Sequence, residues 1–118
     1  MRVMILATSS AESESKPPAS SSHDMEAMGR FHQELTDAGV LLASERLLPS
    51  SSGARVRFVG ASRRVTDGPF VEAKEIVAGY WIWQVDSWDD AIEWMKRAPF
   101  QGGEFEIRQI MEWPAPAE

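Results

Sequence analysis

The N-terminal third of the chain shows a strand pattern followed by a helix pattern. The run from Arg2 to Ala7 is almost entirely apolar, which is typical of a strand covered on both faces. A helix is predicted from Asp24 to Ala38, where apolar residues recur at helical spacing and Gly39 supplies the C-terminal stop. The apolar stripe of this helix is formed by Met28, Phe31, Leu35 and Ala38.

Residues 9–22, between this strand and this helix, have the composition of a loop. The segment holds seven serines and two prolines and has no large apolar residue. One interpretation is a simple surface connection. The other is a lid over a cleft, because long loops inside compact domains are often functional.

The middle of the chain predicts a second strand and a hairpin. The strand runs from Val40 to Leu48 and is ended by Pro49 and a short Ser-Gly loop. Two further extended segments, Ala54 to Val59 and Arg64 to Thr66, turn near Gly60 and predict a β-hairpin.

The C-terminal third contains the strongest strand, a second helix and a last strand. The strand from Tyr80 to Val85 is apolar on both faces, so both faces should be covered. The second helix is expected to start at Ser87, with its apolar stripe on Trp88, Ala91, Ile92 and Met95. Residues 105–112 then predict a strand that places Phe105, Ile107 and Met111 on one face, and residues 114–118 a tail.

The order of these elements predicts one α+β domain over residues 1–118. A β-α-β-β-α-β order with an inserted β-hairpin is the split βαβ, or ferredoxin-like, arrangement. Helices can cover one face of such a small sheet, so the second face needs another cover.

Composition and charge limit the kinds of binding partner and the cellular compartment that we expect for this protein. The net charge is −6 and no cluster of Lys and Arg offers a positive footprint, so direct nucleic-acid binding is not expected. The chain has no cysteine, and its only N-terminal apolar run, Val3 to Ala7, is too short for a signal peptide or a membrane span. We therefore expect a cytoplasmic protein that does not contact membranes.

Charged residues and a Gly-Pro step gather just before the strongest strand. Asp67 is interpreted as a general base, as a partner of Lys74 or as the side-chain acceptor of the turn. Glu72 and Lys74 fall on one face, where they form either a surface salt bridge or an anion-binding group. Phe70 is either a packing residue or a contact for a ligand.

A few other polar residues are candidates for binding or catalysis. His32, on the flank of the first helix's apolar stripe, is either a hydrogen-bonded packing residue or a general acid or base. Arg46 and Tyr80 join it as candidate ligand-binding residues. The histidines at 23 and 32 lack the spacing of a helical metal pair and no phosphate-binding glycine loop occurs, so neither a metal nor another cofactor is expected.

The segment Asp67-Gly68-Pro69-Phe70, with Glu72, Lys74-Glu75 and Gly79-Tyr80 after it, resembles the DGPF branch of the YCII-related family. This resemblance implies a ferredoxin-like fold that forms a dimeric α/β barrel, with two sheets packed across a twofold axis. It also implies an association with sigma factors, which are transcription proteins. In the YCII branch a helical His and an Asp have been proposed as a catalytic pair; here the Asp position matches Asp37, but the His position falls on Met28.

Two classes of function stay open from the sequence, beside a purely structural dimer. The first is a homodimeric, non-enzymatic module that binds a small ligand or a protein partner and is linked to transcription. The second is a cofactor-free lyase or isomerase acting on a small acidic or aromatic molecule. In the enzyme, His32 or Asp67 would move the proton, and Lys74 or Arg46 would hold the anion.

Overall fold

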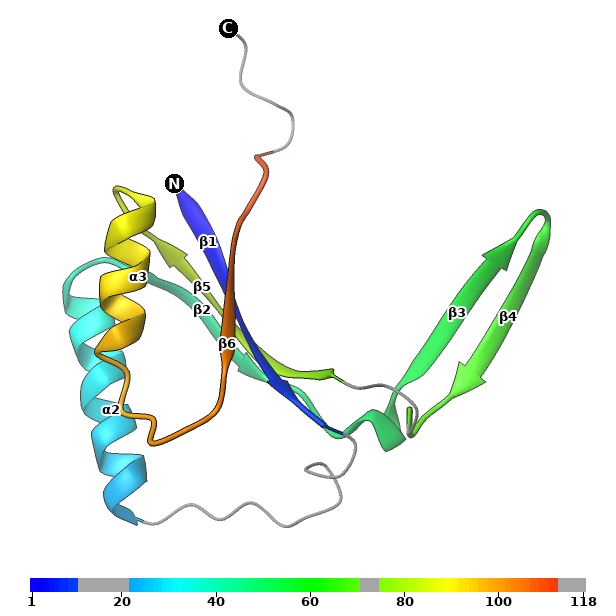
Figure 1. Cartoon of the computed structure of the whole chain (residues 1–118), viewed down its shortest axis with the longest axis horizontal. Helices are drawn as coiled ribbons and strands as arrows, with labels where there is room; N and C mark the ends of the chain where they lie inside the picture. The colour runs from blue at the N-terminus through cyan, green and yellow to red at the C-terminus, as the bar shows by residue number, and fades with distance from the viewer. Residues whose placement is uncertain (11–21, 71–74, 113–118) are drawn as a thin grey trace, which may run out of the picture.

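A computed structural model describes residues 1–10, 22–70 and 75–112, and its elements follow the predicted order (Figure 1). The predicted lid or surface loop falls largely on residues 11–21, outside the described residues. Two helices are present, α2 (Ser22–Asp37) and α3 (Trp88–Lys96). The strands are β1 (Arg2–Ser9), β2 (Leu41–Arg46), β3 (Ala54–Val59), β4 (Ser62–Asp67), β5 (Ile76–Gln84) and β6 (Phe105–Gln109), with a 3-10 turn, η1, at Ser50–Ser52.

Four strands form one antiparallel sheet in the order β2-β5-β1-β6. Strand β1 lies in the centre, where Val3 is paired with Trp83 on one side and with Gln109 on the other. Strand β5 separates β1 from β2, which is the split βαβ arrangement. The α+β class is therefore confirmed, and the topology is compatible with a ferredoxin-like fold.

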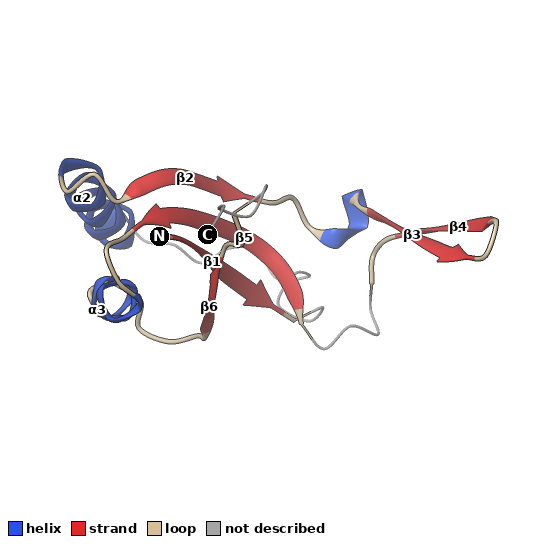
Figure 2. Ribbon diagram, turned by 90° about the horizontal axis from the view of Figure 1, so that it is seen from above, coloured by secondary structure: helices blue, strands red, loops and turns tan. Residues whose placement is uncertain are grey.

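Both helices cover the same face of this sheet, and the core lies between them and the strands (Figures 1 and 2). Trp81 and Trp83 point into this core, as the alternation along the strand predicted. The Phe31 ring of α2 lies between them and α3, with centroid distances of 5.9 Å to Trp81 and 6.5 Å to Trp94. Burial of each such side chain stabilises the fold by roughly 1.5–3 kcal/mol.

The opposite face of the sheet is not covered by any described element. Alternation along the paired central strands places four half-buried apolar or aromatic side chains on this open face: Met4, Leu6, Tyr80 and Ile82. Within residues 1–10, 22–70 and 75–112, no element supplies the cover that the sequence predicts for this face.

The ends of both helices follow their sequence signals. Gly39, just after α2, has a φ of +73°, a left-handed conformation that glycine adopts without a steric penalty. The Ser87 hydroxyl accepts a hydrogen bond from the Asp90 N–H at 3.1 Å and caps α3. Among the described helices, neither is long and apolar enough to cross a membrane.

Two of the predicted apolar faces were partly wrong. Trp88 was expected in the stripe of the second helix but is 41% exposed, and Trp94 packs against the core from the same helix. Met111 was expected to share a strand face with Phe105, but β6 ends at Gln109 and Met111 is 82% exposed. Trp88 is the first residue of α3, and Met111 lies two residues beyond the end of β6.

Strands β3 and β4 form a two-stranded hairpin that projects from the side of the sheet opposite the helices (Figures 1 and 2). The turn is at Gly60, whose φ is +56°, as predicted. Every residue of both strands is exposed. The inserted hairpin is thus confirmed, and it stands clear of the core.

Candidate functional site

The segment Asp67-Gly68-Pro69-Phe70 folds back onto the 3-10 turn η1 and closes the base of the hairpin. The Gly68 N–H donates to the Gly53 carbonyl at 2.9 Å, and the Phe70 N–H donates to the Ser50 hydroxyl at 3.2 Å. Ser50 is only 7% exposed, which is unusual for serine. We call this set of contacts the clasp; it joins the two ends of the hairpin to the chain that precedes it.

Gly68 is required by the close approach of two backbone segments. A Cβ atom on this residue would overlap the Ser50 carbonyl oxygen and lie 2.6 Å from the carbonyl carbon. Gly53, on the other side of the same carbonyl, leaves room: a Cβ there would be 3.4 Å from the oxygen. The close approach of the two backbone segments thus explains the glycine at this position of the signature without any role in ligand binding.

A cavity of about 540 Å³ lies beside the clasp, and we call it the signature cavity. Its walls are mostly apolar, and several of them, including Leu48 at 78%, are exposed to solvent. The Arg55 guanidinium lies 4.0 Å from the centroid of the Phe70 ring, so a fixed cation borders the cavity. The lining residues are Leu47, Leu48, Pro49, Ser50, Ser52, Gly53, Arg55, Phe70, Glu75, Ile76 and Val77.

His32 contacts the core rather than an open cleft. Its Nε2 accepts a hydrogen bond from the Trp81 indole N–H at 3.0 Å, and the two rings meet edge to face at 80°. The lone pair of Nε2 is occupied by this bond. The side chain is half-buried and orients Trp81.

The other predicted site residues lie in separate places. Arg46 pairs with Gly79 and so belongs to the helix side of the sheet, whereas Tyr80 lies on the open face. Asp67 is exposed at the end of β4, near the clasp that holds Phe70. Glu72 and Lys74 lie outside the described residues. Among the predicted residues that the structure describes, only Asp67 and Phe70 therefore lie in one region.

The two positions aligned with the proposed YCII catalytic pair also have local partners. Met28 packs against the core. Asp37 accepts a hydrogen bond from the Gln33 side chain at 2.8 Å on the surface of α2. Within the described ranges, no group of three His, Asp or Glu residues is placed to hold a metal ion.

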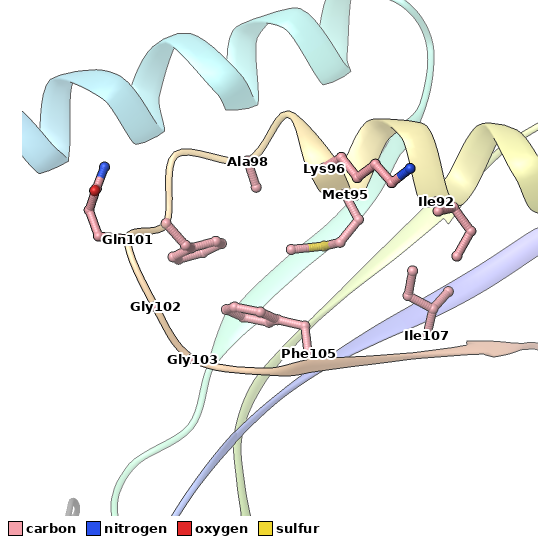
Figure 3. A pocket seen from close by; sticks show the side chains of 10 residues that line it. Ile92, Met95, Lys96, Ala98, Gln101, Gly102, Gly103, Phe105 and Ile107 are labelled. Carbon is pink, nitrogen blue, oxygen red and sulfur yellow. The ribbon is translucent and has the colours of Figure 1, made fainter.

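A second cavity, of about 440 Å³, lies between the end of α3 and strand β6 (Figure 3). The side chains of Met95, Phe105 and Ile107 converge in it, and the Phe100 and Phe105 rings lie 4.4 Å apart. Lys96 is the one charged residue among those that line this cavity, and it already pairs with Glu93 at 3.3 Å. This second cavity therefore offers apolar contacts to a ligand but few polar groups that could recognise it.

Sequence reasoning did not single out Arg55, which is the residue that gives the signature cavity its charge. Arg55 is one of several hairpin arginines, and nothing in the spacing distinguishes it. Its position two residues after Gly53 becomes informative only once the clasp brings Phe70 beside it.

Two comparisons with known proteins bear on this site. The YCII-related domain matches residues 1–114. The chain is also 28% identical over 89 residues to an uncharacterised protein of Rhizobium meliloti (strain 1021), in a match that covers 73% of this chain and 72% of that protein.

Proposed function

The chain belongs to the YCII-related family, and from this premise we propose that it is a homodimeric binding module whose ligand is a small apolar monocarboxylic acid. The observation that carries the proposal is the Arg55 guanidinium stacked on Phe70 at the border of an apolar cavity. A cation held beside apolar walls is the combination that an amphipathic anion requires.

The chemistry of the signature cavity favours a single carboxylate. A guanidinium donates two parallel N–H bonds to a carboxylate, and stacking on an aromatic ring pre-orients its plane. Leu47 and Ile76 line the wall that would receive the apolar body of the ligand. Glu75 adds a negative charge to the same lining, which disfavours a second carboxylate on the ligand.

The open face of the sheet supports the homodimer. Leu6 and Ile82 lie on adjacent central strands with nothing from the described chain above them. A second sheet packed across a twofold axis would bury them and complete the dimeric α/β barrel.

The enzyme reading has less support. A general acid or base must be free to reach the substrate proton, whereas His32 Nε2 already accepts the Trp81 N–H. Asp67 lies near the clasp and Tyr80 on the open face of the sheet, so these two described candidates lie in different places. The DGPF branch, the link to sigma factors and a cytoplasmic location rest on the residue pattern and on the family resemblance.

Calorimetric titration tests the proposed ligand class. We would compare phenylacetate and hexanoate with their uncharged amides, which keep the shape and remove the charge. Binding of an acid at about 100-fold over its Kd should also raise the unfolding free energy by about 2.7 kcal/mol. Only the acids should bind.

Two arginine variants test whether binding depends on the cation of the cavity or on the general positive charge of the hairpin. Arg55→Met should abolish binding of the acids, because Arg55 is the cation of the lining. Arg57→Met, two residues along the same strand and outside the lining, should bind as the wild type does. Equal binding of acids and amides, or equal losses in both variants, would refute the proposed recognition.

A further inference from the structure

The β3–β4 hairpin has two different faces. Alternation along the paired strands gathers apolar side chains on one face, where Val56 lies opposite Val65 and Phe58 is 68% exposed. The other face carries Arg55, with Arg57 directly opposite Arg64. The hairpin therefore has one mainly apolar face, on which the Arg63 guanidinium lies 4.5 Å from the centroid of the Phe58 ring, and one mainly basic face.

Both faces of the hairpin lower its stability in an isolated chain. A two-stranded ribbon with neither face covered is only marginally stable in water. Like charges directly opposite one another, as in the Arg57 and Arg64 pair, destabilise a hairpin further. An acidic partner packed along the hairpin would remove the cost of the like charges, and this points to such a partner.

The charge distribution favours a second copy of this chain as that partner. Residues 54–67 hold four arginines and one aspartate, a net charge of +3. Since the whole chain carries −6, the residues outside the hairpin carry −9. A second copy therefore presents an acidic body to the basic hairpin.

The position of the hairpin leads to the same partner. It projects on the side of the sheet that the helices leave open (Figures 1 and 2). A body that covers Leu6 and Ile82 must therefore lie alongside the hairpin as well. A second copy seated there would meet exposed side chains of both the sheet and the hairpin.

From these observations we infer that the β3–β4 hairpin is an arm that grips the second copy of this chain. The inference rests on the proposed homodimer and adds a second contact region to it. By twofold symmetry each copy extends one arm onto the other. The arm then contributes to how tightly the dimer forms, apart from the sheet contact at its centre.

Sedimentation equilibrium of single charge reversals tests this role. Arg57→Glu should raise the dimer dissociation constant about tenfold, a size typical of an interface contact. Arg30→Glu is the matched control, since it makes the same change on exposed α2, on the other side of the sheet. Phe58→Ser should weaken the dimer through the apolar face.

The outcomes distinguish the arm from the sheet contact. Ile82→Glu places a charge at the centre of the open face and should give monomers whatever the arm does. If Ile82→Glu is monomeric while Arg57→Glu and Phe58→Ser dimerise as the wild type does, the arm inference is wrong and the homodimer stands. A wild type that stays monomeric would overturn both, and the titration with acids would still decide the proposed ligand.

Site-specific cross-linking gives an independent test. The chain has no cysteine, so Ser62→Cys, near the tip of the arm, carries a single photoreactive maleimide label. Illumination should join two copies, and the same label at Thr36→Cys, on the exposed face of α2, should not. Equal cross-linking from both positions would refute the arm. So would binding of a labelled DNA duplex that Arg57→Glu abolishes, because it would assign the basic face to nucleic acid.

Discussion

Substitution of Gly68 by alanine is the sharpest test of the clasp. The added Cβ would overlap the Ser50 carbonyl oxygen and lie 2.6 Å from the carbonyl carbon, so the two segments must separate. Neither side of this contact can yield by a side-chain rotation, because the carbonyl belongs to the backbone and the position of a Cβ is fixed by its own backbone. Gly68→Ala should therefore open the base of the hairpin.

The size of the effect follows from the contacts that separation breaks. The hydrogen bonds from Gly68 N–H to Gly53 and from Phe70 N–H to Ser50 each contribute about 0.5–1.5 kcal/mol. The stacking of Arg55 on Phe70 adds about 0.5–1 kcal/mol. We expect Gly68→Ala to lower the free energy of unfolding by about 2–3 kcal/mol, which is about 10 °C in Tm for a domain of this size.

Thermal unfolding followed by circular dichroism measures this loss, and hydrogen exchange of the Phe70 amide reports the clasp itself. Gly53→Ala is the matched control: its Cβ would meet the same carbonyl oxygen at an ordinary 3.4 Å, and its φ of −104° suits alanine. That variant should unfold within about 0.5 kcal/mol of the wild type. If Gly68→Ala also melts like the wild type and keeps Phe70 protected, the steric reasoning is refuted.

Three further predictions concern contacts outside the clasp. His32→Leu should cost about 1–2 kcal/mol in urea unfolding, because the partly buried Trp81 N–H loses its acceptor, while His32→Gln should restore part of it. Ser87→Ala should cost about 1 kcal/mol by removing the cap of α3, and an unchanged urea midpoint would contradict this. The hydrogen bond from Arg2 holds the pKa of Glu112 below its ordinary value of 4.5, so its stabilisation is present above that pH and lost as the pH falls through the lowered pKa. The Tm difference between wild type and Glu112→Gln should therefore shrink below pH 4.5, and a constant difference would contradict the assignment.

The elements of the fold were predictable because each has a local cause. Gly39 ends α2 through its own backbone conformation, and Ser87 caps α3 through its own hydroxyl. The alternation along the strand placed Trp81 and Trp83 on one face of β5, and both are buried in the core. The periodic pattern also assigned Trp88 and Met111 to apolar faces, but in the structure both residues are exposed.

The candidate site was predictable only in part, because its contacts join segments that no local pattern connects. Phe70 was singled out from the signature, but its hydrogen bond to Ser50 spans a turn of the chain that carries no periodic signal. Arg55 was missed for the same reason. His32 was placed correctly on the flank of the α2 stripe, yet its partner Trp81 is 49 residues away, so only the folded chain identifies the acceptor role.

The central position of β1 has a consequence for how the protein is made. This strand is synthesised well before both of its sheet partners, β5 and β6, which begin at Ile76 and Phe105. At about 5–20 residues per second, a ribosome needs roughly 5–20 s to reach the end of β6, and the apolar strand remains without its neighbours until then. The β3–β4 hairpin pairs only with itself and can form as soon as it emerges. Nascent chains of this protein should therefore depend on holding chaperones at their N-terminal strand.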